Sequence, residues 1–476
     1  MGDIFQNYVG GEFVDGDSGR SIPVEDPATG EAFAEHALAG PESFEAAIAA
    51  ARGAFSKGVL SRAAPAGRAQ LLHRIAAQLR GVKAEGGKAL CLEQGKALSK
   101  AEDEFEKAAA AFEYYGGLAD KAEGRQVPVS STIIDFTMLE PLGVSLQIVP
   151  WNFPVSIAAR SIAAALATGN SVILKSPEIT PIGLHYMARA IDAAGTPKGT
   201  VSVLNATGRE TGENLVEHPQ IDQITFTGSV ATGKSILAAA SRHVVPCVME
   251  LGGKSAGIAL EDADVAKVVA AVKGSIISNA GQVCSGMTRL LVHRSRMDEV
   301  LEALRALAGQ VSVGPGVEES DLTPLVSDIQ QSRVIDAVDR GRNFAELVCG
   351  GTVPARPGHY YDFTVFANVD PASSLGQEEI FGPVLSVMAF DEIEEAVEIA
   401  NGTPYGLAAG IFTNRLNEAL AIAQNLRAGQ IYGNLWHAGS IAAPFGGFGQ
   451  SGYGRERGYE AIYNYAKSKN IAFSIA

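Results

Sequence analysis

Residues 144–149 read Val144-Ser145-Leu146-Gln147-Ile148-Val149, the first of four short apolar runs in this part of the chain. The other three are residues 171–174, 201–204 and 223–226. Each run is followed by a loop and then by a helix-like segment, which is the order found where parallel strands are joined by crossover helices. The pattern predicts an α/β domain built on a parallel sheet.

A second series of apolar runs begins near Leu251 and includes residues 290–292, 385–388 and 410–412. A chain of 476 residues is long enough for about two or three domains. Two α/β domains therefore fit this pattern better than one.

Helical periodicity is clearest before these runs. Residues 42–56 and 66–80 are rich in alanine with apolar positions at helical spacing, and residues 100–115 continue this pattern with Glu and Lys on the solvent side. Residues 126–140 are instead rich in β-branched and apolar residues, which predicts an extended, hairpin-like arm. The apolar strand expected at residues 471–475 needs covering, and a partner subunit is one way to cover it.

The charge balance excludes several classes of partner. The formal net charge is −15 and the pI is near 5.1, which disfavours binding to nucleic acid or to an anionic membrane. No basic amino-terminal stretch leads into an apolar core, and no run of about eighteen apolar residues is present. We expect a soluble cytoplasmic protein.

Cysteine and histidine usage gives no metal signature. The four cysteines, Cys91, Cys247, Cys284 and Cys349, are widely separated and show no CxxC spacing. The eight histidines are scattered and form no HExxH motif. We expect neither a zinc site nor a disulfide framework, and no metal catalysis.

Cys284 and Glu250 are the strongest catalytic candidates. Cys284 lies between Gly281 and Gly286, and Glu250 ends an apolar run that precedes Gly-Gly. A single cysteine is more often a small core residue, and a single glutamate is more often a solvated strand-end charge. Together they suggest a two-step reaction, in which a thiol attacks a carbonyl and a carboxylate activates the water that releases the acyl group.

Two glycine motifs point to nucleotides. Residues 228–235 match G-x-x-x-x-G-K-[ST] between an expected strand and an expected helix, so a P-loop NTPase is a rival interpretation. The same glycines would equally hold a dinucleotide pyrophosphate at a helix amino terminus. Residues 447–452 match G-x-G-x-x-G but follow no strand and lie too near the carboxyl terminus for a βαβ unit, so we expect a loop there.

Lys175 and Glu178 follow a buried strand. Such a pair is often only a solvated turn, but ligands bind at the carboxyl ends of strands in α/β sheets. An acid there accepts both hydroxyls of an adenosine ribose and repels the 2′-phosphate of NADP. Glu178 therefore favours NAD as the cofactor.

Taken together, these segments resemble the aldehyde dehydrogenase superfamily, and the likeness runs nearly end to end. It rests on Asp26-Pro27-Ala28-Thr29-Gly30, Pro150-Trp151-Asn152-Phe153-Pro154, Lys175-Ser176-Pro177-Glu178, Phe226-Thr227-Gly228-Ser229, Glu250-Leu251-Gly252-Gly253-Lys254, Gly281-Gln282-Val283-Cys284, Glu379-Ile380-Phe381-Gly382-Pro383 and Pro444-Phe445-Gly446-Gly447.

The resemblance implies a role for each of these sites. Cys284 is expected to be the nucleophile, Glu250 the general base and Asn152 a donor to the oxyanion, in a non-acylating, NAD-dependent enzyme. The expected cofactor-binding residues are Trp151, Lys175, Glu178, Gly208, Gly228, Ser229, Gly233, Leu251, Glu379 and Phe381.

The resemblance also implies an architecture: two doubly wound open-sheet domains, one of them a Rossmann-like cofactor domain and the other catalytic, with a small β oligomerisation arm. We expect the NAD-binding domain at residues 1–123 and 142–249 and the catalytic domain at 250–445. The arm is expected at 124–141 and 459–476, in a homodimer or homotetramer.

Arg160 and Phe153 are the candidate substrate-binding residues. Arg160 lies eight residues after Asn152, where relatives acting on semialdehydes or hydroxyaldehydes often carry arginine; a structural salt bridge is the alternative. Succinic semialdehyde dehydrogenases carry a second arginine where this chain has Ser278. Many relatives have lysine where this chain has Ser161, which weakens a proton relay linked to Glu456.

Other activities remain open at this point. Lys175-Ser176-Pro177-Glu178 has its proline one position later than is usual in the family, although both charged ends are kept. An acylating dehydrogenase that passes the thioester to coenzyme A would typically lack Glu250. A non-catalytic structural relative would be expected to lack the thiol or the base.

Overall fold

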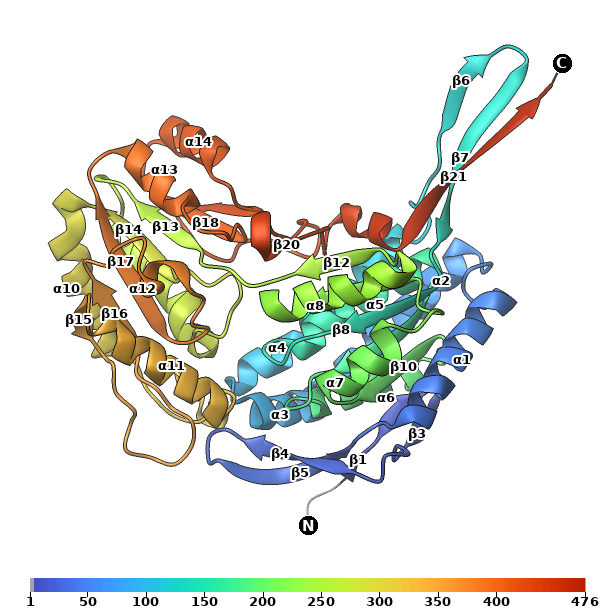
Figure 1. Cartoon of the computed structure of the whole chain (residues 1–476), viewed down its shortest axis with the longest axis horizontal. Coiled ribbons are helices and arrows are strands. Elements are labelled where there is room, and N and C mark those ends of the chain that lie inside the picture. Colours follow the sequence, from blue (N-terminus) through green and yellow to red (C-terminus); the bar gives the residue numbers. More distant parts are fainter. Residues whose placement is uncertain (1–3, 476) are drawn as a thin grey trace.

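Two large sheets, each flanked by helices, form the two halves of the chain in the computed structural model (Figure 1), which describes residues 4–475. The eight-stranded sheet has the order β20-β12-β11-β8-β9-β10-β2-β3. Its strands are β20 (Gly452–Tyr453), β12 (Cys247–Glu250), β11 (Gln223–Thr227), β8 (Val144–Ile148), β9 (Ser171–Ser176), β10 (Val201–Asn205), β2 (Asn7–Val9) and β3 (Glu12–Val14).

The seven-stranded sheet has the order β15-β16-β17-β14-β13-β18-β19. Its strands are β15 (Glu346–Cys349), β16 (Thr364–Ala367), β17 (Val384–Phe390), β14 (Arg289–His293), β13 (Ala256–Ala259), β18 (Ala408–Phe412) and β19 (Gln430–Gly433). Strands β8 to β12 in the first sheet are mutually parallel, as are β13, β14 and β16 to β19 in the second. The predicted α/β architecture is confirmed.

The helices connect and cover these strands. They are α1 (Pro41–Lys57), α2 (Pro65–Gly81), α3 (Lys83–Gln94), α4 (Leu98–Leu118), α5 (Pro154–Thr168), α6 (Ile182–Ala193), α7 (Gly208–Thr211), α8 (Val230–Ala240), α9 (Val265–Val272), α10 (Met297–Ala308), α11 (Asp328–Gly341), α12 (Ser374–Gln377), α13 (Ile393–Asn401) and α14 (Leu416–Asn425). None of the helices in residues 4–475 combines the length and the apolar character needed to cross a bilayer.

Strand β9 shows why the first sheet is wound on both faces. Val172 and Leu174 belong to the core formed with α2 to α6, whereas Ile173 belongs to the core formed with α1 and α8. Because successive side chains of a strand point to opposite faces, a run that is apolar at every position needs helices on both sides. This is the physical reason for the continuous apolar runs in the sequence.

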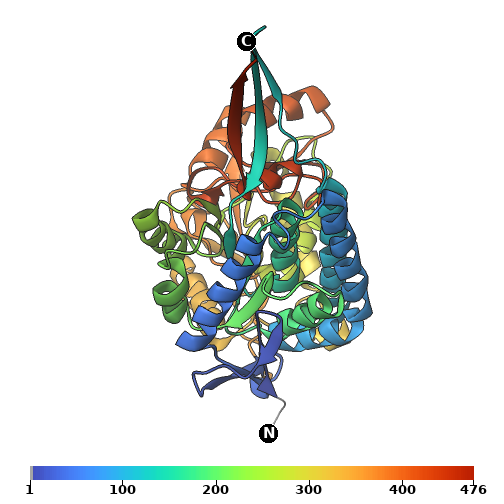
Figure 2. The same cartoon turned by 90° about the vertical axis from the view of Figure 1, so that its right-hand side faces the viewer.

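Two small sheets extend from this body. One contains β1 (Ile4–Phe5), β5 (Glu31–Ala37) and β4 (Ser21–Asp26). The other, the arm, contains β6 (Gln126–Ser130), β7 (Ile133–Pro141) and β21 (Ala466–Ser474). Figure 2 shows the arm as a narrow blade that carries the carboxyl end away from the body. The predicted hairpin and terminal strand are both present, and they pair with each other.

Candidate active site

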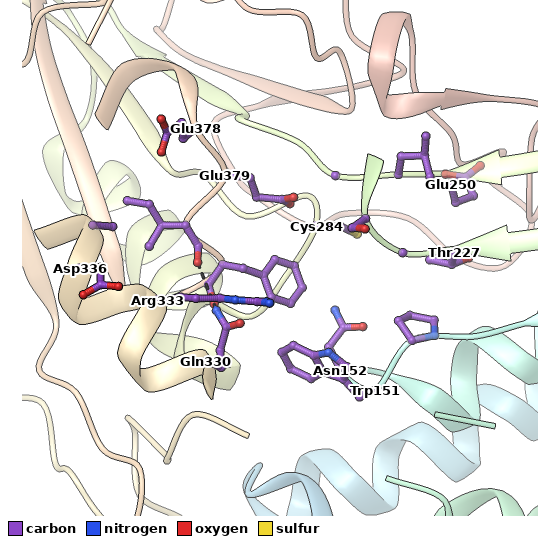
Figure 3. A pocket seen from close by; sticks show the side chains of 18 of the residues that line it. Trp151, Asn152, Thr227, Glu250, Cys284, Gln330, Arg333, Asp336, Glu378 and Glu379 are labelled. Carbon is purple, nitrogen blue, oxygen red and sulfur yellow. Dashed lines mark hydrogen bonds between the residues drawn. The ribbon is translucent and has the colours of Figure 1, made fainter. Parts of the chain in front are cut away.

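A cavity of about 850 Å³ lies between the loops of the two large sheets (Figure 3). One wall comes from the loops that follow β8, β11 and β12, and the other from α11, the segment after α12 and Cys284. The cavity brings together nine of the predicted site residues: Trp151, Asn152, Gly228, Ser229, Glu250, Leu251, Cys284, Glu379 and Phe381.

The direction of the strands explains this convergence. Strands β8, β11 and β12 are parallel neighbours, so their carboxyl ends share one edge of the sheet. Asn152 lies just after β8, Gly228 follows β11 directly, and Glu250 is the last residue of β12. Ligands bind at this edge in open α/β sheets.

The Cys284 loop has an unusual backbone. Asn279, Ala280 and Gly281 adopt positive φ angles of 53°, 51° and 69° in succession. A Cβ at Gly281 would clash with the carbonyl oxygen of Gly382. The glycine therefore allows the nucleophile loop to pack directly against the segment that carries Phe381.

The Cys284 thiol is half-buried. Burial raises its pKa to about 11, and the positive charge of Arg160 acts in the opposite direction. In the view of Figure 3, Cys284 lies between Glu379 and Glu250. The thiol is therefore protonated at neutral pH in this environment, and its reaction requires a group that takes the proton or stabilises the thiolate.

Asn152 is fixed beside the nucleophile loop. Its side chain is 3% exposed, and its Nδ2 donates to the carbonyl oxygen of Gln282 at 2.9 Å. The backbone carbonyl oxygen of Asn152 accepts from Nζ of Lys96 at 2.7 Å. Because a side-chain amide has two N–H groups, one remains for an oxygen in the cavity.

Glu250 is 2% exposed, and neither of its carboxyl oxygens has a hydrogen-bond partner within residues 4–475. Burial raises its pKa well above the usual value, Glu456 raises it further, and Arg160 lowers it. A buried carboxyl group without partners is costly and therefore calls for an explanation. A group that exchanges protons with water in the cavity would account for it.

A second buried carboxylate, Glu456, lies near Glu250. Arg160 forms an ion pair with Glu456, and the hydroxyl of Ser161 donates a hydrogen bond to it. The salt bridge that was the alternative for Arg160 is thus present. Ser161 thus contacts Glu456 through a neutral hydroxyl group.

Several predicted cofactor residues make specific contacts in the cavity. The rings of Trp151 and Phe381 meet edge to face with centroids 5.3 Å apart. Glu379 accepts from the backbone N–H of Gly253 at 3.0 Å, and burial raises its pKa to about 7. Ser229 caps α8 by accepting from the backbone N–H of Thr232. The cavity therefore offers aromatic faces, a carboxylate and a helix amino terminus.

Six predicted residues do not line this cavity: Phe153, Arg160, Lys175, Glu178, Gly208 and Gly233. Lys175 and Glu178 form an ion pair at 3.6 Å, and a Cβ at Gly208 would lie 3.9 Å from the Glu178 carboxylate. Lys175 is the penultimate residue of β9, Glu178 follows β9 and Gly208 follows β10, and these are the next strands along the same edge. A Cβ at Gly233 would lie 2.7 Å from Leu251, so this glycine allows close packing of α8.

Phe153 lies against a buried cation: the Lys96 ammonium is 4.2 Å from the centre of its ring. Phe153 also precedes the first residue of α5, which fixes the turn after Asn152. Its contact with a substrate stays a prediction.

The P-loop alternative lacks the geometry it requires. Helix α8 begins at Val230, so the residues between Gly228 and Gly233 form its first turn instead of a loop that wraps around phosphates. Lys234 is exposed and donates to the side chain of Gln450 at 3.3 Å. The glycine motif marks a strand, a short turn and a helix amino terminus.

Two parts of the site were missed in the sequence. Helix α11 contributes Gln330, Arg333, Asp336 and Arg340 to the cavity wall. The segment at residues 447–452 was expected to be a loop and not a βαβ unit; it contains a 3-10 turn (Gly449–Ser451) that leads into β20. It supports the segment after β12, because Ser451 donates to the carbonyl oxygen of Gly252 at 2.7 Å. To predict either of these two parts of the site, one would need to know which distant segments of the chain contact each other.

Comparison with known proteins gives one consistent result. The model of the Aldehyde dehydrogenase family matches residues 13–471. An aldehyde dehydrogenase of Aspergillus niger is 36% identical over 471 residues, covering 98% of this chain and 95% of that protein. A betaine aldehyde dehydrogenase of Cereibacter sphaeroides is 36% identical over 468 residues, covering 98% of this chain and 96% of that protein.

A solved structure shows the same similarity. The NAD+ complex of an aldehyde dehydrogenase from Bacillus cereus superposes with a TM-score of 0.97 at 37% identity, covering 99% of this chain and 97% of the other. The agreement extends over both large sheets and the arm.

Proposed function

This chain belongs to the aldehyde dehydrogenase family, and from that premise we propose that it oxidises an aldehyde to a carboxylic acid with NAD, through a thioester on Cys284 that is hydrolysed by a water activated by Glu250. The observation that carries the proposal is that Cys284, Glu250 and Asn152 line one cavity. The family membership gives the reaction class, and the convergence of the three side chains supports the role proposed for each of them.

The cavity fits a nicotinamide cofactor. Its volume of about 850 Å³ lies in the usual range for cofactor sites. Glu379 and Phe381 would hold the nicotinamide end near Cys284, and the amino terminus of α8 with Gly228 and Ser229 would hold the pyrophosphate. When bound, NAD supplies the hydride acceptor for the oxidation.

The first step is attack by the thiol sulfur of Cys284 on the aldehyde carbon. The thiol proton must leave, because burial keeps its pKa near 11, and the oxyanion that forms needs a donor. The free N–H of the Asn152 amide supplies one, and a donor of this kind is typically worth about 3 kcal/mol of barrier. Its hydrogen bond to Gln282 holds the amide in place.

Loss of hydride from the former aldehyde carbon to NAD would leave a thioester on Cys284, and the second step is the hydrolysis of that thioester. Glu250 takes a proton from water, and the resulting hydroxide attacks the acyl carbon and releases the acid from Cys284. Burial raises the pKa of Glu250 well above the usual value, so its carboxylate is a stronger base than an ordinary glutamate. Glu250 also favours hydrolysis over transfer of the acyl group to coenzyme A.

Glu178 supports a preference for NAD over NADP. It lies at the end of β9 with Lys175, next to Gly208, where its carboxylate would accept the ribose hydroxyls and repel a 2′-phosphate. We further propose the domain division given above and a homodimeric or homotetrameric assembly through the arm. The substrate proposed from Arg160 is a semialdehyde or a hydroxyaldehyde.

The test is NADH formation from a panel of aldehydes. The purified wild-type enzyme should reduce NAD with at least one aldehyde, and Cys284→Ala should abolish this activity. Cys247→Ala is the matched control, because this second half-buried cysteine lies outside the cavity lining; it should retain activity. Normal turnover by Cys284→Ala would overturn the proposal.

A further inference from the structure

Arg457 is a half-buried arginine in an unusual position. Its backbone has a φ of 59°, a left-handed conformation that costs free energy for a residue with a side chain. Within residues 4–475 its guanidinium has no carboxylate within ion-pair distance and no hydrogen-bond partner. Its close contact is with the ring of Phe445, whose centre lies 5.0 Å from the guanidinium carbon.

Arg160 provides a direct contrast. Its guanidinium carbon lies 5.4 Å from the centre of the same Phe445 ring, but its charge is paired with Glu456. Arg160 is therefore largely neutralised, whereas Arg457 keeps an unpaired charge among the residues that the structure describes. Of the two arginines beside Phe445, Arg457 is the one with all five N–H donors free.

This charge lies beside the candidate catalytic residues. Phe445, whose ring contacts both arginines, directly precedes Gly446, and a Cβ at Gly446 would lie 2.8 Å from Oε1 of Glu250. The same region is linked to the nucleophile loop by Trp436, whose indole N–H donates to the carbonyl oxygen of Ser285 at 2.9 Å.

Among the described residues, no close counter-charge neutralises Arg457. His437, which packs on Tyr432 and Trp436, is a neutral imidazole, because burial and then Arg457 and Lys107 lower its pKa to about 4. The carboxyl groups that interact with Arg457 are Glu456, already paired with Arg160, and Glu250, whose burial raises its pKa well above the usual value. The unpaired charge of Arg457 therefore attracts an anion.

We propose that Arg457 determines substrate specificity by binding a carboxylate on the aldehyde substrate, so that the enzyme prefers aldehydes that carry an acid group. A guanidinium matches a carboxylate with two parallel hydrogen bonds, and partial burial strengthens them. Of the two substrate classes proposed above, semialdehydes are thereby favoured over hydroxyaldehydes. The residue that recognises the substrate is Arg457 instead of Arg160. The inference rests on the proposed function.

The first experiment compares acids with their neutral esters. Glyoxylate, succinic semialdehyde and adipic semialdehyde are each assayed with NAD beside the corresponding methyl ester, which removes the charge and keeps the chain length. For at least one length, kcat/KM for the acid should exceed that for the ester by about tenfold or more, as a charged hydrogen bond provides. The KM of the acid, and not that of the ester, should rise with salt.

The second experiment changes the arginine. Arg457→Met should lower kcat/KM for the preferred acid by about 10- to 100-fold, mainly through KM, and leave the ester unchanged. Arg457→Lys should keep part of the preference. Arg427→Met is the matched control, because Arg427 is exposed to solvent and likewise lacks an ion pair within the described chain; it should leave both substrates unaffected.

Three outcomes would overturn the inference: equal rates for acids and esters in the wild-type enzyme, an equal loss for acid and ester in Arg457→Met, or full acid preference in that variant. If Arg457→Met does not fold, Arg457→Gln is assayed in its place with the same acids and esters. Oxidation of other aldehydes without a preference for acids rejects this inference alone, whereas no NADH from any aldehyde of the wider panel rejects the proposed function itself.

Discussion

In the proposed mechanism Glu250 and Cys284 both act in the deprotonated form, yet their environments favour the protonated form. Burial, then Glu456, raises the pKa of Glu250 well above the usual value, and burial raises the pKa of Cys284 to about 11. Because both pKa values are raised, the deprotonated fraction of each group increases as the pH rises above neutrality. We expect kcat and kcat/KM to increase from neutral into alkaline pH.

Steady-state NADH formation across this pH range, with enzyme stability checked at each value, measures the effect. A rate that falls as the pH rises through neutrality would contradict the assignment of either group as a base or a nucleophile. A parallel profile of Glu250→Gln separates the two groups, because only the thiol still titrates there.

Replacing Glu250 by glutamine should separate the two halves of the reaction. The amide keeps the size of the side chain but cannot take a proton from water, so acylation of Cys284 proceeds and hydrolysis stops. We expect a burst of NADH close to one equivalent per active site, followed by a steady-state rate lower by about 100-fold or more.

Rapid mixing with NAD and an accepted aldehyde records this burst. Glu213→Gln serves as the control, since Glu213 is an exposed residue paired with Arg209 on the surface, and it should show wild-type turnover. An unchanged steady-state rate in Glu250→Gln would remove it from the role of base.

Among the helices and strands, the sequence predicts those in which the apolar residues follow a simple pattern. The runs at residues 172–174 and 290–292 are apolar at every position, as expected at the centre of strands that are covered on both faces. The residues just after the strands of the first sheet follow from strand direction, so the sequence pattern is enough to place Asn152, Gly228 and Glu250 at one edge.

Helix α3 shows what such reasoning misses. Its segment contains Gly86 and Gly87, which normally weaken a helix. In the structure a Cβ at Gly87 would lie 3.0 Å from the Cα of Glu102, and one at Gly86 would clash with Phe105. The glycines thus allow α3 and α4 to approach closely. The sequence does not predict the site residues of α11 for another reason. Arg333 and Asp336 are typical of an ordinary charged helix surface, and only the fold places them at the cavity.

The junction of α3, α4 and α5 depends on one buried lysine. Lys96, just after α3, pairs with Glu104 of α4 and donates to the carbonyl oxygen of Asn152 just before α5. Glu104 in turn accepts from the backbone N–H of Ser156. Burial lowers the pKa of Lys96 while Glu104 raises it, so each charge is tolerated because of the other.

Lys96→Met should therefore destabilise the protein by about 3–5 kcal/mol, because it leaves Glu104 buried without a counter-charge. It should also reduce kcat, since the backbone of Asn152 loses its anchor. Chemical denaturation and steady-state kinetics measure the two effects. Lys121→Met, which removes an exposed pair with Asp120, should cost about 0–1 kcal/mol. Similar unfolding free energies for the two variants would refute the argument.

At the scale of the whole molecule, the arm is the feature that a single chain does not explain. Strand β21 pairs with β7 along nine residues, with Phe473 opposite Ile134 and Ile471 opposite Phe136. Directly opposed residues point to the same face of a sheet. These four residues, together with Met138 two positions further along β7, form an apolar strip on one face of the arm, and Phe473 is 61% exposed.

Such a strip on a protruding sheet supports the proposed assembly of copies of the chain through the arm. We expect the double substitution Met138→Asp and Phe473→Asp to lower the mass of the assembly in solution, because it places two charges in the buried contact. Light scattering after gel filtration measures that mass. Asn470→Asp, on the opposite face of β21, adds a charge without touching the strip and should leave the assembly intact. An unchanged mass in the double variant would place the interface elsewhere.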